Sequence, residues 1–293
     1  MHILVTGGAG ALGRYFVAEA TGKHEITVFD RVAPAAVDES VYVVTADISD
    51  ADALAGALQG VDLVINLAAE ARLIPDERHM FEANVAAPFN VLEAMKAVGV
   101  TRLIHASSIC AYGAIFHAGP LRPEYLPIDE DHPLRPEDAY GMSKVINEVM
   151  IQSYADRLGW ATCCLRFATV WIPEADFPFT PKYVSSITNV ALKSDRYWAY
   201  VDARDVARAL VATAEHLEEH EPGFLALNIG AAGTVNGDDA IEAAREHYPD
   251  AELRPIEPAG QTDAPLYSIS YAKKVLGYAP QHTWEEYINL LNE

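Results

Sequence analysis

Three glycines stand where the chain passes from its first apolar run into its first helical pattern. The run is His2–Thr6, and Gly7, Gly10 and Gly13 follow it. Gly7 allows a tight turn, Gly10 allows the backbone to approach a ligand closely, and Gly13 allows a helix to pack closely on a strand. The free N–H groups at the start of a helix favour an anion there. The motif therefore predicts a strand, turn and helix that bind the pyrophosphate of a dinucleotide.

Apolar runs alternate with helical patterns throughout the first half of the chain. The runs are rich in Val, Ile and Leu with little alternation, which is typical of strands covered on both faces. We expect strands at His2–Thr6, Ile26–Asp30, Val41–Thr45, Leu63–Leu67 and Arg102–Ala106, and helices at Ala11–Ala20, Ala51–Leu58, Arg78–Ala97 and Tyr140–Leu158. This alternation predicts an α/β fold with a doubly wound parallel sheet of the Rossmann type.

The second half of the chain is less regular. We expect strands at Thr162–Val170 and Phe224–Ile229, a loop at Trp171–Pro181, and helices at Asp202–Glu218 and near Gly237–Glu246, Ser270–Leu276 and Trp284–Leu291. We predict that residues 1–170 form the dinucleotide-binding domain and that residues 200–230 return to it. Residues 171–199 and 231–293 are predicted to form a smaller substrate-binding lobe.

Side chains at the carboxyl ends of the expected strands indicate which dinucleotide binds. Asp30 ends the second strand, where a carboxylate accepts hydrogen bonds from the adenosine ribose and repels the 2′-phosphate of NADP. Arg31 follows and either pairs with that phosphate or lies solvated in a loop. We therefore predict NAD, with NADP as the alternative. Asp47 follows the third strand and either contacts the cofactor or caps the helix that starts near Asp50.

Composition narrows the class of partners. The chain has 293 residues and a formal net charge of −21, which disfavours nucleic acid and anionic membranes as partners. No apolar run approaches the roughly 20 residues of a membrane span, and the first residues lack the pattern of a signal peptide, so we expect a cytoplasmic protein. Cys110, Cys163 and Cys164 form no pattern typical of a disulfide framework or a zinc site, and no other group of residues indicates a metal.

Four segments, taken in order, match one family. They are Gly-Gly-Ala-Gly-Ala-Leu-Gly at 7–13, Asn-Leu-Ala-Ala at 66–69, Ala-Ser-Ser-Ile-Cys-Ala-Tyr-Gly at 106–113 and Ala-Tyr-Gly-Met-Ser-Lys at 139–144. The set resembles the NAD-dependent epimerase/dehydratase family, the extended short-chain dehydrogenases/reductases, and the likeness extends through residues 200–206. The motifs are specific to this superfamily and say little about the substrate.

The resemblance implies a catalytic site made of Ser108, Tyr140 and Lys144. Residues four apart share a helical face, so Lys144 would lie beside Tyr140 and also reach the nicotinamide ribose. Tyrosine titrates near pH 10, so its work as a base near pH 7 costs about 4 kcal/mol, which the Lys144 ammonium and the positive nicotinamide ring would supply. Ser108 would hold the substrate oxygen while Tyr140 removes its proton and hydride leaves for the cofactor. The alternative is that Tyr140 merely packs and Lys144 is solvated.

The resemblance also extends the expected site beyond the catalytic residues. Asn84 matches a family asparagine near the cofactor, or else it is an amide on the helix surface. The expected cofactor contacts are Gly7, Gly10, Ala11, Leu12, Gly13, Asp30, Arg31, Asp47, Ile48, Leu67, Ala68, Ala69, Asn84, Tyr140, Lys144 and Phe167, and the expected substrate contacts are Glu70, Ser108, Ile109, Cys110 and Glu174.

Departures from the family pattern bear on the reaction. Family dehydratases have an Asp-Glu pair directly after the catalytic hydroxyl, where this chain has Ile109 and Cys110, so we do not expect a dehydration. Family epimerase-reductases pair a cysteine at the position of Cys110 with a histidine, but Glu174 stands where that histidine would be. We therefore interpret Cys110 as a thiol that lines the pocket. The segment Arg166–Glu174 is similar to uronate dehydrogenases.

Three functions follow from these observations. The first is an NAD-dependent dehydrogenase of a sugar or sugar acid, and the second is a nucleotide-sugar 4-epimerase that keeps its NAD bound. The third is a non-catalytic protein that senses NAD(P), and the presence of all three catalytic residues argues against it. Net consumption of free NAD would separate the first two functions, whereas the fold alone does not.

Two of the expected helices carry more apolar side chains than one buried face needs. These are Met80, Phe81, Val85, Phe89, Leu92 and Met95 on one helix and Val145, Val149 and Tyr154 on the next. Members of the family often dimerise by pairing these two helices, so we predict a homodimer. The alternative is that the same side chains face the sheet.

Overall fold

The computed structural model describes residues 1–70, 76–115, 122–173, 197, 199–235, 240–256 and 265–286. The chain divides into two compact units, and each is assembled from three separate stretches. The first unit contains Met1–Ser107, Met142–Leu165 and Leu210–Ala226, and the second contains Ser108–Gly141, Arg166–Ala209 and Leu227–Glu293. The assignment of a substrate-binding lobe to residues 171–199 and 231–293 stays a prediction.

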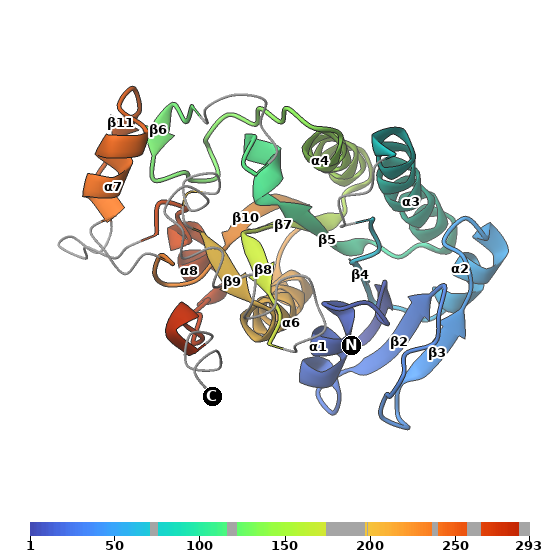
Figure 1. The fold of residues 1–293 in the computed structure, drawn as a ribbon. Coiled ribbons are helices and arrows are strands. Elements are labelled where there is room, and N and C mark those ends of the chain that lie inside the picture. The colour runs from blue at the N-terminus through green and yellow to red at the C-terminus, as the bar shows by residue number, and fades with distance from the viewer. Residues whose placement is uncertain are drawn as a thin grey trace. The chain divides into compact units, whose positions relative to one another are not determined.

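A seven-stranded sheet runs in the order β10-β7-β5-β4-β1-β2-β3. Its strands are β1 His2–Thr6, β2 Glu25–Asp30, β3 Tyr42–Thr45, β4 Leu63–Asn66, β5 Arg102–Ser108, β7 Ala161–Phe167 and β10 Gly223–Ile229. Strands β3, β2, β1, β4 and β5 pair in parallel, and Figure 1 shows β1 between β2 and β4. The chain builds from β1 to β3 and then crosses back to continue with β4 and β5. This reversal is the doubly wound arrangement, so the predicted fold class is confirmed.

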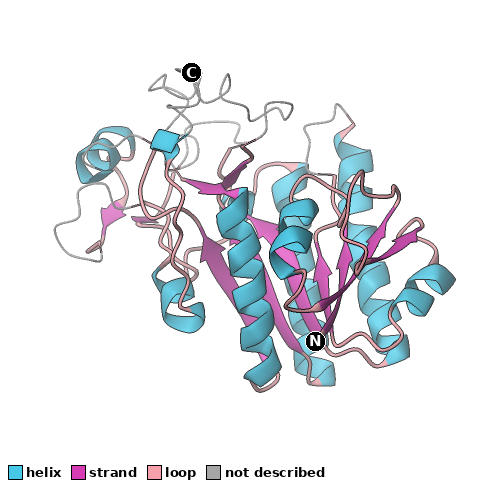
Figure 2. Ribbon diagram, turned by 90° about the horizontal axis from the view of Figure 1, so that it is seen from below, coloured by secondary structure: helices cyan, strands magenta, loops and turns pink. Residues whose placement is uncertain are grey.

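Helices connect the strands and lie against them (Figure 2). They are α1 Gly13–Ala20, α2 Ala51–Ala57, α3 Glu77–Val98, α4 Ala139–Leu158 and α6 Ala203–Glu219. Side chains set several boundaries: Asp76 accepts a hydrogen bond from the His79 N–H at 3.0 Å to start α3, which ends where Gly99 adopts a φ of +90°. None of the helices among the described residues has the length and apolar character needed to cross a membrane.

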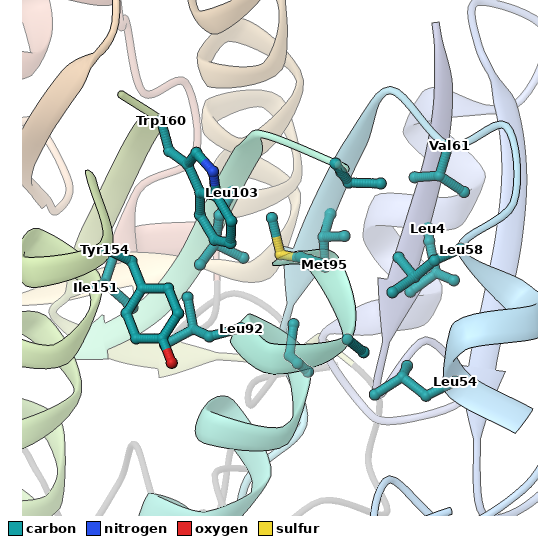
Figure 3. Close-up of a cluster of buried hydrophobic side chains, with 14 of the residues drawn as sticks. Leu4, Leu54, Leu58, Val61, Leu92, Met95, Leu103, Ile151, Tyr154 and Trp160 are labelled. Carbon is teal, nitrogen blue, oxygen red and sulfur yellow. The ribbon is translucent and has the colours of Figure 1, made fainter. Parts of the chain in front are cut away.

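The core of the first unit lies between the sheet and helices α2, α3 and α4 (Figure 3). Buried side chains from β1, β4 and β5 meet those of the three helices. They are Leu4, Val64, Leu103, Leu54, Leu58, Leu92, Met95, Ile151 and Tyr154. Each such side chain contributes about 1.5–3 kcal/mol when it is fully buried, which is why the apolar pattern predicts these elements well.

Two of the predicted strands differ from the structure. The strand at residues 41–45 was expected to be covered on both faces, but β3 ends the sheet and Tyr42 is 63% exposed. The single strand expected at Thr162–Val170 is wrong, because β7 ends at Phe167 and a new strand, β8 Thr169–Trp171, begins after Ala168. The Ala168 N–H donates to the Ile229 carbonyl at 2.9 Å, and β8 then pairs with a different strand. A continuous apolar run does not reveal such a change of partner.

The second unit contains two small parallel sheets. One pairs β8 with β9 Tyr200–Asp202, and the other pairs β6 Tyr125–Leu126 with β11 Glu252–Leu253. Helix α8 has the predicted bounds, Ser270–Leu276, and α7 covers Ala240–His247. Of the helix predicted at Trp284–Leu291, residues 284–286 are described, and they are helical.

A buried polar network supports the second unit around Arg166. The Arg166 guanidinium donates to the Tyr112 hydroxyl at 2.6 Å and to the Glu130 carbonyl at 3.1 Å. The Glu130 carboxylate accepts from the Asn228 N–H at 2.7 Å, and the Tyr112 hydroxyl bonds the Asn228 side chain at 2.9 Å. Burial raises the pKa of Glu130 to about 7, although the Asn228 N–H and the Arg166 charge act in the opposite direction.

This raised pKa predicts a pH-dependent stability that Glu130→Gln removes. Between the ordinary glutamate pKa and pH 7 the folded protein binds a proton that the unfolded chain has released, so stability falls as pH rises through this window. We expect wild-type protein to lose roughly 2–3 kcal/mol relative to Glu130→Gln between pH 4.5 and pH 7. Urea unfolding at several pH values measures the difference, and Asp131→Asn, at the exposed neighbouring residue, should leave it unchanged. An equal stability difference between wild type and Glu130→Gln at all pH values would contradict this origin.

Candidate cofactor and catalytic site

The glycine turn between β1 and α1 is packed so closely that it admits no side chain at two of its positions. Gly7 has a φ of +71°, and a Cβ there would lie 2.8 Å from the Ala68 backbone nitrogen. A Cβ at Gly13 would lie 2.6 Å from the Gly8 Cα and closer still to the Gly7 carbonyl oxygen. The Gly10 N–H donates to the Gly7 carbonyl at 3.0 Å, which closes the turn. The first unit thus brings the predicted glycines together with the segment that follows β4.

The start of α1 carries no side chain that competes with an anion. Ala11 and Leu12 lead into the helix, which begins at Gly13, and no side-chain hydrogen bond caps it at Leu12. No acidic residue lies in its first turn. The helix therefore presents the positive end of its dipole at the glycine turn, where a phosphate group would be stabilised.

Asp30 lies directly against this turn. It ends β2, and its carboxylate accepts a hydrogen bond from the Ala9 N–H at 3.0 Å and another from the Val32 N–H at 3.3 Å. The Arg31 guanidinium donates to Glu70 at 3.1 Å, so Arg31 is paired rather than merely solvated. Glu70, which was expected to contact the substrate, thus bonds a residue at the predicted adenosine end of the site.

Asp47 does not cap the following helix. Its carboxylate accepts from the Ser49 N–H at 2.9 Å and the Ser49 hydroxyl at 2.6 Å, and these bonds hold the pKa of Asp47 below its usual value. The cap of α2 is Asp50, which accepts from the Ala53 N–H at 3.0 Å. The alternative of Asp47 as a helix cap is therefore wrong. Ile48 packs against the hydrophobic core.

Asn84 on α3 holds the segment that follows β4. This segment contains Leu67, Ala68, Ala69 and Glu70, and the Leu67 N–H donates to the Thr6 carbonyl at 3.0 Å. The Asn84 amide accepts from the Glu70 N–H at 2.7 Å and donates to the Glu70 carbonyl at 3.1 Å. Because Asn84 is only 2% exposed, the alternative of an amide on the helix surface is wrong.

A buried polar chain that the sequence patterns did not predict lies beneath the same edge of the sheet. The Thr6 hydroxyl donates to Asn66 at 2.6 Å, and the Asn66 amide donates to the His105 Nδ1 atom at 3.2 Å. The His105 Nε2 atom has no hydrogen-bond partner among the described residues. Burial, and then the charge of Lys144, hold the pKa of His105 well below its usual value, so this ring is neutral. A histidine inside an apolar run was the available signal.

The second unit brings Ser108 and Tyr140 together. Ser108 ends β5, and its hydroxyl accepts from the Cys110 N–H at 3.2 Å. Burial raises the pKa of Tyr140 far above its usual value, with further contributions from Cys110 and Asp138, while a hydrogen bond with Ser108 acts in the opposite direction. The half-buried tyrosine is therefore protonated at neutral pH, with a serine hydroxyl as its neighbour.

Lys144 belongs to the first unit and lies four residues after Tyr140 on α4. Its side chain is buried, so the alternative of a solvated lysine is wrong, and its Nζ atom donates to the Ala106 carbonyl at 2.8 Å. Close to it, the Ser107 hydroxyl donates to the buried Glu148 carboxylate at 2.5 Å. Two contacts therefore tie the last residues of β5 to α4.

Of the remaining predicted contact residues, three are described by the structure and one is not. Ile109 and Cys110 are buried in a short 3-10 helix, Ile109–Tyr112, and Phe167 is buried at the end of β7. Glu174 lies outside the described residues, so its contact with the substrate stays a prediction. No group of three His, Cys, Asp or Glu residues in the described part of the chain is placed to hold a metal ion.

Comparison with known proteins decides the family. The model of the NAD dependent epimerase/dehydratase family matches residues 3–230. This chain belongs to that family. The predicted resemblance is thus confirmed, and the protein is an NAD-dependent enzyme of the extended short-chain dehydrogenase/reductase type.

Relatives of two enzymatic kinds match the chain. A UDP-glucose 4-epimerase of Corynebacterium glutamicum is 27% identical over 97% of this chain and 92% of its own length. An L-arabinose 1-dehydrogenase (NAD(P)(+)) of Haloferax volcanii is 34% identical over 60% of this chain and 68% of its own length. A uronate dehydrogenase of Pseudomonas putida is 31% identical over 57% of this chain and 60% of its own length. The crystal structure of a UDP-galactose 4-epimerase has a TM-score of 0.71, 28% identity, and coverage of 98% of this chain and 96% of that chain.

The residues of the first unit fit a dinucleotide. The glycine turn is a cradle that a Cβ at Gly13 would fill, the start of α1 is open to an anion, and the Asp30 carboxylate is fixed beside the turn. These are the groups that a pyrophosphate and an adenosine ribose require.

The cradle predicts that Gly13→Ala removes dinucleotide binding. The added methyl group meets backbone atoms that have no room to move, so we expect a loss of about 1–3 kcal/mol in the free energy of unfolding together with loss of binding. Gly56→Ala is the matched control, because a Cβ there meets nothing within 4 Å. Gly56 lies inside α2, so this control should gain about 0.5–1 kcal/mol. Urea unfolding and calorimetric titration with NAD+ measure both, and unchanged NAD+ affinity in Gly13→Ala would contradict the cradle.

Proposed function

We propose that this protein is an NAD-dependent dehydrogenase that oxidises a hydroxyl group of a free sugar or sugar acid. The observation that carries the proposal is the hydrogen bond between the buried Ser108 and the half-buried Tyr140, formed where β5 ends and α4 begins. A free sugar is favoured because the relatives with 34% and 31% identity are dehydrogenases of arabinose and uronates.

Ser108, Tyr140 and Lys144 would each have a different role in removing the proton from the substrate hydroxyl. Ser108 would accept or donate a hydrogen bond at the substrate hydroxyl oxygen, and Tyr140 would take the proton from that oxygen. Since burial raises the pKa of Tyr140, positive charge has to approach the phenol before it can act as a base. Lys144, whose ammonium is fixed by the Ala106 carbonyl, supplies one such charge from the same helix. NAD, when bound, supplies the acceptor for the hydride that leaves the substrate carbon.

A nucleotide-sugar 4-epimerase is the second candidate. It is supported by the UDP-glucose 4-epimerase that aligns with 97% of this chain, whereas the arabinose dehydrogenase aligns with 60%. In that function the same three side chains would act, but no free NAD would be consumed.

Absorbance at 340 nm separates the two functions. Purified protein is mixed with free NAD+ and a panel of free sugars, uronic acids and UDP-sugars. We expect NADH to form with a free sugar or sugar acid, and Tyr140→Phe to lower the rate by about 100- to 10,000-fold because the phenolic hydroxyl is lost. Tyr154→Phe is the control, since Tyr154 lies on the same helix but packs in the hydrophobic core and bonds Glu93.

Either alternative outcome has a clear meaning. If no member of the panel yields NADH, but denatured protein releases NAD and the native protein interconverts UDP-sugars, the epimerase function replaces the dehydrogenase. If Tyr140→Phe keeps the wild-type rate, Tyr140 is not the base.

We also propose that α3 and α4 pair with those of a second copy. Some of the apolar side chains predicted for the interface are buried within the chain itself, namely Met80, Leu92, Met95 and Tyr154. Others are exposed: Phe89 is 46% exposed and Val149 is 63% exposed. Met142 and Ile146 add exposed apolar surface to α4. An apolar face of this kind on two helices suits a symmetric interface. The cytoplasmic location stays a prediction.

The dimer predicts that a charge on this face separates the copies. Val149→Glu should shift the sedimenting species to a monomer of 31.9 kDa at micromolar concentration, because a buried unpaired carboxylate opposes association. Tyr42→Glu, a similar change at an exposed residue of β3, should leave the dimer intact. Wild-type protein that sediments as a monomer would exclude the proposed pairing.

A further inference from the structure

An ion pair crosses the carboxyl end of β1. Arg31 directly follows β2, and Glu70 comes shortly after β4, which ends at Asn66. In the sheet β1 lies between these two strands (Figure 1). The Arg31 Nη2 atom nevertheless lies 3.1 Å from the Glu70 Oε1 atom. The pair therefore spans the end of the strand from which the glycine turn starts.

One partner of this ion pair is anchored and the other is not. The Glu70 backbone is held on both sides by the buried Asn84 amide, at 2.7 Å and 3.1 Å. Asn84 is held in turn by the Asn147 amide, which donates to its carbonyl at 3.0 Å. Movement of this group would leave buried polar atoms unpaired, which is costly. Arg31, by contrast, has a side chain that is 67% exposed, so its guanidinium is the partner free to reorient.

Arg31 is the positive group nearest in sequence to the predicted ribose-binding carboxylate. Asp30 is fixed at the glycine turn by the Ala9 N–H. A guanidinium beside that carboxylate is the group best suited to pair with the 2′-phosphate that distinguishes NADP from NAD. The orientation of Arg31 therefore bears directly on which dinucleotide binds.

We propose that Glu70 is a specificity-determining residue, which favours NAD over NADP by holding the Arg31 guanidinium in an ion pair. To meet a 2′-phosphate, Arg31 would have to leave Glu70, whose carboxylate would then stand unpaired near a second anion. NAD lacks the phosphate, so its binding leaves the pair undisturbed. The inference rests on the proposed NAD site, and it assigns Glu70 to cofactor selection instead of substrate binding.

Calorimetric titration of the full-length protein, freed of nucleotide, with NAD+ and with NADP+ tests the assignment. Glu70→Gln should tighten NADP+ binding by about 3- to 5-fold, as expected for the loss of one exposed competing ion pair, and change NAD+ binding by less than about 2-fold. In the Arg31→Ala background the same Glu70→Gln change should have no effect on NADP+, because no guanidinium remains to be released. Glu77→Gln, which removes one exposed carboxylate from the first turn of α3, controls for net charge.

Each other result overturns the proposal in a different way. Equal changes for both dinucleotides, a gain that persists without Arg31, or the same gain in Glu77→Gln would each show that Glu70 does not act through Arg31. If NAD+ binds but the ratio of the two dissociation constants is unchanged, the Glu70 assignment fails and the proposed NAD site stands. If neither dinucleotide binds to wild-type protein, the proposed function fails as well.

Discussion

Two polar contacts in the interior of the first unit join the end of β5 to α4. The Lys144 ammonium donates to the Ala106 carbonyl at 2.8 Å, and the Ser107 hydroxyl donates to Glu148 at 2.5 Å. A buried charge without a partner costs several kcal/mol, so these contacts fix the position of α4 along the end of β5. Ser108 is the next residue after Ser107 and the last one of β5, and Tyr140 lies on α4. Regular elements, joined by interior polar bonds, therefore carry the three proposed catalytic residues.

The parts of the fold that local chemistry controls were predictable from the sequence. Helix α3 lies between a capping aspartate and a left-handed glycine, Asp76 and Gly99, and its predicted bounds differ from the observed ones by one residue at each end. The expected strand at Thr162–Val170 failed for a different reason. Its residues are nearly all buried, but they change partner at Ala168, and which strand lies alongside is decided by chain that is distant in sequence.

The candidate site divides in the same way. The glycine turn was indicated by its spacing directly after the first strand, and Tyr140 and Lys144 were implied by the resemblance of their motif to the family. The chain of Thr6, Asn66 and His105 joins three strands, and its one local signal, a histidine inside an apolar run, does not reveal its partners on the other two strands. Glu70 was expected to contact the substrate, whereas its carboxylate meets Arg31 from the far side of β1. Long-range polar contacts of this kind depend on side-chain reach, which periodicity does not encode.

The negative net charge of the chain opposes association through the exposed edge strand β3. An open sheet edge with apolar side chains such as Tyr42 and Val43 is a template on which another copy can add its own edge. Short length limits this hazard, since β3 spans only Tyr42–Thr45. The net charge of −21 limits it further, because two such edges must approach against mutual repulsion. We therefore expect the folded protein to associate more readily wherever acid neutralises its carboxylates or salt screens them.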